Sequence, residues 1–444
     1  MTATTTGHTV DTRAIWAIAL PAMITNVATA LIGIGDMWIV GQLGHAPTQG
    51  AVDVGARLFA VLFTVMNFLK TGTTGLVAQA GTRSGEPEQA AMLLRGLMVG
   101  LVIAALLLVA KPLILPLALD ALGAEGQVRS AAVVYTDIRY WSAPAVLLNF
   151  ALIGYLVGRR RMTTVLVIEI GYNLLNLALG LWLALGLDMG IAGIGWSSLI
   201  AEYAKLAVLS GIVLSGPTGA ALVNRARAGG IAGPAHLLPF LKVNRDLFLR
   251  TLVLVVALAA LTRLSAERGA IVLAANGIIY QMFIFTALLL DGFENAAQVL
   301  NGERAGARDR SGFTRFVTAI LWRGMIVAAV LAVAFALLGD AVLASFAATP
   351  AVAIAAQDLK HWLVVMPFAG LAGFVLDGVF VGASWTRALL ATMLGATVVF
   401  AIALWASWPL GSQGLWLSFT AFLVARALFQ LVLLGRLTRR EFDR

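Results

Sequence analysis

The chain has 444 residues, of which 60% are hydrophobic and 12% charged, and its formal net charge is +9. An ordinary soluble protein is about half apolar and about a quarter charged, so this composition excludes a typical soluble enzyme and indicates a chain solvated by lipid. The apolar runs are long and continuous, which excludes the short alternating strands of a membrane barrel. Cysteine is absent, which excludes disulfides, thiolate nucleophiles and cysteine metal sites.

The apolar runs are each long enough to span a membrane as a helix, which needs about 20 residues. In chain order, the predicted spans are residues 14–40, 52–80, 94–118, 130–157, 162–186, 190–215, 245–266, 270–301, 316–338, 356–382, 388–409 and 412–436. The first run lacks a basic leading segment and is too long for a cleavable signal peptide, so we expect it to remain as the first span. The sequence therefore predicts an all-α polytopic membrane protein with about twelve transmembrane helices.

The loops between these spans alternate in charge. Most loop arginines and lysines fall on one side of the membrane, whereas the other side keeps Arg129, Arg263 and Arg268. Because basic loops stay in the cytoplasm, we expect a bacterial inner-membrane protein with both termini cytoplasmic. The basic excess is then topological, which indicates anionic membrane lipid as its partner and argues against nucleic acid.

An internal repeat divides the chain. Residues 81–85 align with residues 302–306 at an offset of 221, and residues 154–158 align with residues 378–382 at an offset of 224. A polar interval rich in glycine and alanine separates the two halves. Six spans return the chain to its starting side, so the halves share one orientation, as in transporters built from parallel repeats.

The predicted organisation follows from this repeat. We expect an N-terminal six-helix lobe over residues 1–215, a cytoplasmic linker over residues 216–244 and a C-terminal six-helix lobe over residues 245–444.

The motifs of the chain resemble those of the multidrug and toxic compound extrusion (MATE) transporters, and most closely their DNA-damage-inducible protein F (DinF)-like branch. The matching segments are Pro21-Ala22, GDMWIVGQLG at 35–44, FLKTGTTGLVAQ at 68–79, VLAAN at 272–276, LDGF at 290–293, GARD at 306–309 and LDGVFVGA at 376–383. The resemblance implies a V-shaped fold of two pseudo-symmetric six-helix lobes with 12 transmembrane helices. It also implies an antiporter that exports organic cations or other amphiphiles, driven by protons or sodium.

Ionisable residues inside the spans are the strongest functional candidates, because a charge at mid-membrane costs a few kcal/mol. Asp36 lies in the outer part of the first span, and Pro21 lies about half a span below it, where a missing backbone hydrogen bond permits a kink. Burial favours the protonated form of a carboxylate, so Asp36 is a candidate for proton coupling. Its alternative role is a helix cap or an ion pair near the periplasmic surface.

Glu169, Asn173 and Asn176 share one face of the fifth span at i, i+4 and i+7. We predict that this face points into the protein and couples a proton or a cation; interhelical hydrogen bonds are the alternative role of the two amides. MATE members often carry an aspartate where this sequence has Gly180. Because a sodium site wants several charged oxygen ligands, its absence favours proton over sodium coupling. Lys205 and Glu202 are expected to form a structural pair near a helix end.

Both halves supply further candidates for the substrate cleft. Lys70 and Asp291 occupy matching positions in the repeat alignment, and we hypothesise that they pair across the cleft; satisfaction of each within its own lobe is the alternative. The remaining candidates for the substrate cleft are Tyr140, Asn276, Asp291, Glu294 and Asp377, together with Pro21 and Lys70.

These features favour a secondary antiporter that exports amphiphilic or cationic drugs by alternating access, without a cofactor beyond the ion gradient and without a resident metal. The alternative is a lipid or lipid-linked saccharide flippase of the same superfamily, for which Lys70 would hold an anionic head group. An enzyme is not expected, because no catalytic constellation or nucleotide-binding loop is present. We expect a monomer that binds small molecules and membrane lipids.

Overall fold

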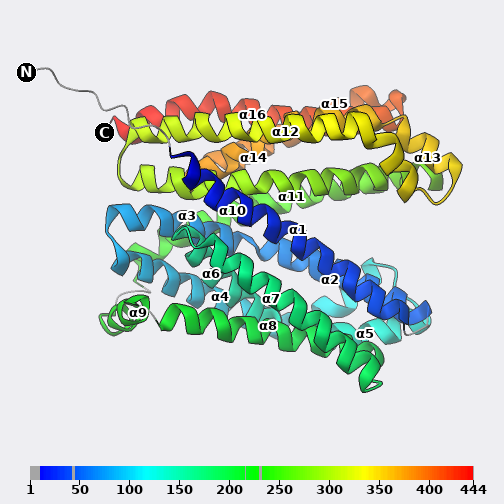
Figure 1. The fold of residues 1–444 in the computed structure, drawn as a ribbon, viewed down its shortest axis with the longest axis horizontal. Coiled ribbons are helices and arrows are strands. Elements are labelled where there is room, and N and C mark those ends of the chain that lie inside the picture. Colours follow the sequence, from blue (N-terminus) through cyan, green and yellow to red (C-terminus); the bar gives the residue numbers. More distant parts are fainter. Residues whose placement is uncertain (1–10, 43–45, 216, 230–232, 444) are drawn as a thin grey trace, which may run out of the picture. The chain divides into compact units, whose positions relative to one another are not determined.

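The computed structural model describes residues 11–42, 46–215, 217–229 and 233–443, and the side chains of residues 31–37, 46, 217 and 218 fall outside this description. The described chain is helical and contains no strand (Figure 1). Its α-helices are α1 (Thr12–Gln42), α2 (Ala46–Met66), α3 (Phe68–Arg83), α4 (Glu86–Ala121), α5 (Gly126–Tyr140), α6 (Ala143–Gly158), α7 (Met162–Gly180), α8 (Gly190–Leu214), α9 (Pro217–Arg227), α10 (Pro234–Ala266), α11 (Ala270–Gly306), α12 (Arg310–Phe346), α13 (Pro350–Gln357), α14 (Lys360–Gly382), α15 (Thr386–Ser407) and α16 (Ser412–Phe442).

Within the described residues, 11 helical segments are long and apolar enough to cross a membrane, and the bent pair α5–α6 brings the total to 12. This number confirms the all-α, multi-pass architecture predicted from the apolar runs. The chain is therefore a multi-pass membrane protein.

Two of the predicted spans are interrupted. The second span is divided into α2 and α3 at Asn67. The fourth span is divided into α5 and α6, which are bent by 47°, and Pro144 lies in the first turn of α6. Proline lacks a backbone N–H and is tolerated in the first turn of a helix, so the new helix starts there and the old one does not continue.

The interval predicted as a linker contains helices. It holds α9 and the first turns of α10, which begins at Pro234. Helix α9 packs against α4 and α8, and its Leu222 is buried. The composition predicted a polar connection, whereas the structure shows a helix with a buried apolar position against the neighbouring helices.

The chain forms two compact units. The first unit comprises Met1–Met23 and Ala257–Arg444, and the second comprises Ile24–Val256. Helices α1 and α10 each run through a boundary between the units. The lobes predicted at 1–215 and 245–444 describe the sequence repeat and remain a prediction.

Glycines on one helix of each unit allow a close approach to a neighbour. In the second unit, a Cβ at Gly154 of α6 would lie 2.6 Å from the Lys70 carbonyl oxygen of α3, and one at Gly158 would lie 2.8 Å from the Thr74 carbonyl oxygen. In the first unit, Cβ atoms at Gly378 and Gly382 of α14 would collide with the carbonyl oxygens of Glu294 and Gln298 of α11. The GxxxG segments of the repeat are therefore helix-packing motifs.

These contacts also define which residues of the two units correspond. Gly154 faces Lys70, and its repeat partner Gly378 faces Glu294. Packing therefore matches Lys70 with Glu294, one helical turn beyond the Asp291 predicted by the sequence alignment. The short sequence match at residues 302–306 has an offset of 221, whereas the glycine contacts correspond to an offset of 224. The two alignments of α11 therefore differ by about one helical turn.

The substitution Gly154→Ala tests the close approach of α6 to α3. The added methyl group would force α6 away from the Lys70 carbonyl, and overpacking of this kind costs about 1–3 kcal/mol. We expect this loss in the unfolding free energy measured by SDS titration in detergent micelles. The control is Gly171→Ala in α7, where an added Cβ would meet no atom within 4 Å; an equal loss in both variants would contradict the packing role.

Candidate functional site

A buried lysine organises the middle of the second unit. Helices α7 and α8 lie side by side (Figure 1), and Lys205 of α8 lies roughly 14 Å from the Leu214 end at 1.5 Å per residue. Its ammonium nitrogen is 3.6 Å from a carboxylate oxygen of Glu169 and 3.3 Å from one of Glu202. The Lys205 side chain is 8% exposed. A charge this deep in an apolar helix bundle needs partners within the protein, and Lys205 has two.

An aromatic ring and an amide complete the surroundings of Lys205. The ammonium lies 3.8 Å from the ring centre of Tyr172, a distance at which the negative face of the ring attracts a cation. Asn149 of α6 donates to the Glu202 carboxylate over 2.9 Å and to the Glu202 carbonyl over 3.1 Å. Two carboxylates thus share one ammonium group, and the charge of Arg139 also acts on Tyr172 in this cluster.

The polar face of α7 points inward, as the spacing predicts. Glu169 and Asn176 are buried. Both amide atoms of Asn173 are enclosed and make no hydrogen bond with the residues that the structure describes. Glu169 pairs with Lys205, and Arg159, which precedes α7 in the chain, pairs with Glu86 over 3.0 Å. The coupling role of this face stays a prediction.

Asp36 lies within α1, but its side chain belongs to the residues outside the description, so its role also stays a prediction. Gly180 of α7 lies near the same part of α1, because a Cβ there would come within 2.9 Å of the Ile39 side chain. The next neighbour of that Cβ would be the Ser197 hydroxyl of α8, 3.6 Å away. A carboxylate at position 180 would therefore need the Ile39 side chain to move.

The first unit contains a second buried cation. The Arg426 guanidinium of α16 lies 3.6 Å from the Asp377 carboxylate of α14, and both side chains are at most 2% exposed. Gln430 donates to Asp377 over 2.5 Å. A Cβ at Gly373 would lie 2.8 Å from the guanidinium, so the absence of a side chain there leaves room for the arginine. Helices α14 and α16 pack against each other.

Two half-buried carboxylates of α11, Asp291 and Glu294, also act on the Arg426 guanidinium through their charge. Three acidic groups, counting Asp377, therefore lie in the field of one arginine. No described set of three or more acidic or histidine side chains is arranged to hold a metal ion.

Two further cleft candidates lie in the interiors of their units. The hydroxyl of Tyr140 donates to the Leu107 carbonyl over 3.1 Å. Asn276 donates to the Ser265 hydroxyl over 3.0 Å and accepts from the Trp416 indole over 2.9 Å. Both side chains have internal partners, so both brace helices in these positions.

The remaining candidates lie in separate units. Lys70 and Pro21 are half-buried, in α3 and in the part of α1 that belongs to the first unit. Asp291 belongs to the first unit and Lys70 to the second, and the predicted pairing between them stays a prediction.

The centres of both clusters were only partly predicted from the sequence. The predicted pair between Lys205 and Glu202 is confirmed, but its predicted place near a helix end is wrong, because Lys205 lies well inside α8. No role was predicted for Arg426, Gln430 or Tyr172. A signal was present, since Lys205 and Arg426 are isolated basic residues within apolar spans, where an unpaired charge is costly.

Comparison with known proteins adds independent information. The MatE family profile matches residues 21–182 and 247–406, one segment in each half of the chain. DNA damage-inducible protein F of Escherichia coli strain K12 is 32% identical over 94% of this chain and 90% of its own length. A probable multidrug resistance protein NorM of Chromobacterium violaceum is 23% identical over 98% of this chain and 96% of its own.

A solved structure shows the same fold. The crystal structure of MATE in the bent conformation aligns with a TM-score of 0.86, covering 97% of this chain and 96% of that chain at 16% sequence identity.

The substitution Lys205→Met tests whether the lysine neutralises its cluster. It leaves Glu169 and Glu202 buried without their cation, and removal of one partner of a buried pair costs about 3–5 kcal/mol. We expect a loss of about this size in the unfolding free energy, with partial recovery when Glu169→Gln is added.

The control for this experiment is Arg57→Met, which breaks an exposed pair with Asp53 and should cost no more than about 0.5 kcal/mol. If Lys205→Met is as mild as this control, or if Glu169→Gln worsens the loss, the lysine does not serve as the counter-charge.

Proposed function

The chain belongs to the MatE family of transporters, and from this premise we propose that it is a secondary antiporter that exports amphiphilic or cationic compounds in exchange for protons. The resemblance to this family and to its DinF-like branch is confirmed by the family profile and by the Escherichia coli relative. The family consists of transporters, so the expectation that the chain is not an enzyme is also confirmed. The multidrug resistance protein among its relatives supports the class of exported compound.

The observation that carries the proposal is the gathering of several carboxylates around one buried cation in each unit. In the second unit, Glu169 and Glu202 share Lys205; in the first unit, Asp377 and two further acids lie around Arg426. Burial disfavours the charged form of a carboxylate, and a bound cation or a proton compensates that charge. A cluster that can exchange a proton for an organic cation has the property that an antiporter requires.

Protons suit the second unit better than sodium for two reasons. Lys205 already occupies the space between Glu169 and Glu202, whereas a proton adds to a carboxylate oxygen without a separate coordination shell. In addition, Gly180 provides no carboxylate where relatives of this family often have one, and sodium needs several oxygen ligands with negative charge.

In the proposed cycle, protonation of the carboxylates of the second unit weakens their attraction for a bound organic cation and favours release of that cation. Deprotonation restores the negative charge and prepares the unit for the next substrate. Asp36 is the principal proton-responsive group, and Glu169 supports it from α7. The substrate and the proton compete for the same charge, which is the thermodynamic condition for exchange.

The proposal places the protein in the bacterial plasma membrane as a monomer, with both termini in the cytoplasm. The alternation of basic loops supports this orientation. The ion gradient is the energy source, and the lipids are both solvent and partner.

Transport in proteoliposomes tests the proposed coupling. With a fluorescent lipophilic cation and an imposed proton gradient, we expect Asp36→Asn to reduce export at least about tenfold, because one titratable group is lost where the cycle needs it. Glu169→Gln should reduce export less. The matched control is Asp53→Asn, an exposed carboxylate on the same unit, which should transport as the wild type does.

Two results of this assay count against the proposal. If Asp36→Asn exports the dye at the wild-type rate, proton coupling through this residue is wrong. If a sodium gradient without a proton gradient drives full export, the coupling ion is wrong although the antiport function stands.

Alternating access would place a specific demand on α1. This helix belongs to the first unit up to Met23 and to the second from Ile24, and Pro21 lies within it. Since proline removes a helical hydrogen bond, α1 bends most easily close to this boundary. We expect Pro21→Ala to slow the export rate several-fold while equilibrium substrate binding changes little.

The control for Pro21→Ala is Pro112→Ala, in a helix that lies wholly within the second unit. Export rate and substrate affinity, measured on the same preparations, distinguish a slower conformational change from weaker substrate binding. Equal slowing by both substitutions would contradict a hinge at Pro21.

A further inference from the structure

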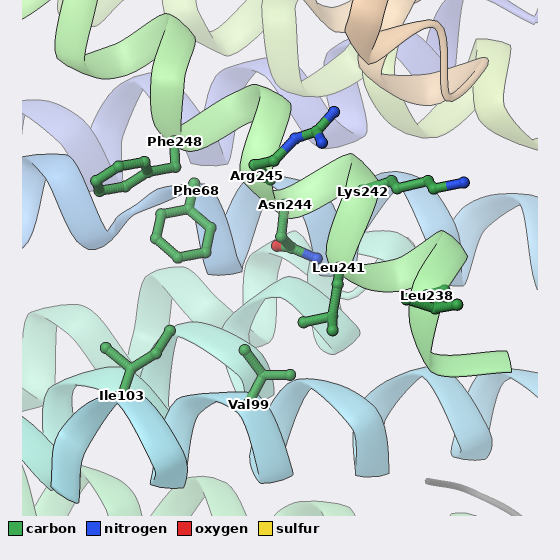
Figure 2. Close-up of a pocket in the computed structure, with 9 residues that line it drawn as sticks. All are labelled: Phe68, Val99, Ile103, Leu238, Leu241, Lys242, Asn244, Arg245 and Phe248. Atoms are coloured by element: carbon green, nitrogen blue, oxygen red, sulfur yellow. The ribbon is translucent and has the colours of Figure 1, made fainter. Parts of the chain in front are cut away.

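An apolar groove of about 400 Å³ lies within the second unit, between α3, α4 and α10 (Figure 2). Its walls are formed chiefly by Phe68, Val99, Ile103, Leu241 and Phe248. In Figure 2, Val99 and Ile103 of α4 point toward Leu241 and the two phenylalanines. The rings of Phe68 and Phe248, both part of the lining, meet edge to face with centroids 5.7 Å apart.

The floor of the groove depends on a close contact between α3 and α10. Asn244 is buried, and its amide group donates to the Phe240 carbonyl over 2.8 Å. A Cβ at Gly72 would lie 2.5 Å from its amide oxygen, so α10 can approach α3 only because Gly72 lacks a side chain. The groove is thus fixed by packing, and it has the size of an ordinary small-molecule site.

Two basic residues stand at one end of the groove. Lys242 is exposed, and no described acidic side chain pairs with it. Arg245 lies 2.7 Å from the Asp246 carboxylate, so the three charges together leave one positive charge. The charged ends of Lys242 and Arg245 extend out of the groove in Figure 2.

The position of these charges along α10 matches the edge of a bilayer. Arg245 and the Ala266 end of α10 are separated by about 32 Å of helix at 1.5 Å per residue. The hydrocarbon core is about 30 Å thick, and helices are tilted by about 20° on average. Arg245 and Lys242 therefore lie at the cytoplasmic boundary, and Phe248 lies about one turn deeper in the hydrocarbon.

We propose that this groove binds an anionic glycerophospholipid of the cytoplasmic leaflet. Its phosphate contacts Lys242 and Arg245, and one acyl chain follows the apolar walls toward Phe68 and Phe248. Basic pockets between helices on the cytoplasmic side suit anionic head groups. The bound lipid fastens the first half of α10 to α3 and α4.

An exported organic cation fits this groove less well. It would find the same apolar walls, but its charge would meet the positive charge of Lys242 at the rim. The proposal rests on the membrane orientation proposed above, but it does not depend on transport, because it concerns a lipid retained by the resting protein.

Native mass spectrometry of the full-length protein in detergent, titrated with phosphatidylglycerol or phosphatidylcholine, tests the site. We expect Lys242→Gln to weaken phosphatidylglycerol binding about fivefold, the effect of one basic residue near a membrane surface, and to leave phosphatidylcholine unchanged. The charge-matched control is Arg436→Gln, an exposed basic residue of α16. We expect this control to bind both lipids as the wild type does.

A second pair of variants tests the groove itself. Val99→Phe fills the apolar groove and should abolish the retention of phosphatidylglycerol. Val109→Phe, at a position on α4 that is 80% exposed, should leave this retention unchanged. Equal affinity for the two lipids, equal effects of Lys242→Gln and Arg436→Gln, or lipid retained by Val99→Phe would overturn the proposal. A further outcome would also overturn the proposal: Val99→Phe abolishes binding of a lipophilic cation but leaves phosphatidylglycerol binding intact. The groove would then be a substrate site.

Discussion

A charge in the middle of a membrane-spanning helix must find its counter-charge within the protein, because lipid offers none. In each unit, a described cluster of carboxylates meets this requirement with a cation on the last long helix of a six-helix half. Lys205 contacts Glu169 and Glu202, and Arg426 contacts Asp377. More than one carboxylate lies around the cation in both clusters. The proposed exchange of protons for organic cations depends on the charge of these carboxylates.

The two clusters use different cations, and the difference is physical. Lys205 is a compact charge that contacts two carboxylates and the face of Tyr172. Arg426 is a planar group that fits into space left by Gly373 and lies 5.1 Å from the ring centre of Phe374. The two cations therefore differ in shape, and each lies among groups that its shape can contact.

Glycine contacts bring helices of both units close together. Gly154 and Gly158 bring α6 against α3, and Gly378 and Gly382 bring α14 against α11. Without a hydrophobic force between helices in lipid, association depends on van der Waals contact and on polar interactions. The same device appears at Gly72, where it seats α10 and shapes the groove assigned to a phospholipid. Close packing at glycines thus brings helices together, and buried ion pairs join particular helices to one another.

Local properties of the chain were sufficient to predict the class of the protein. Apolar runs of membrane length, alternating loop charge and two short repeats predicted an all-α multi-pass transporter in two halves, because hydrophobic length and repeat spacing are local properties of a chain. The inward face of Glu169 and Asn176 followed from helical periodicity in the same way. Only the tertiary structure decided which charges meet, since Lys205 and Glu169, or Arg426 and Asp377, lie on different helices and no periodicity relates them. It also decided the register of the repeat, where packing matches Lys70 with Glu294 because the glycine contacts, and not a five-residue similarity, fix how the helices lie.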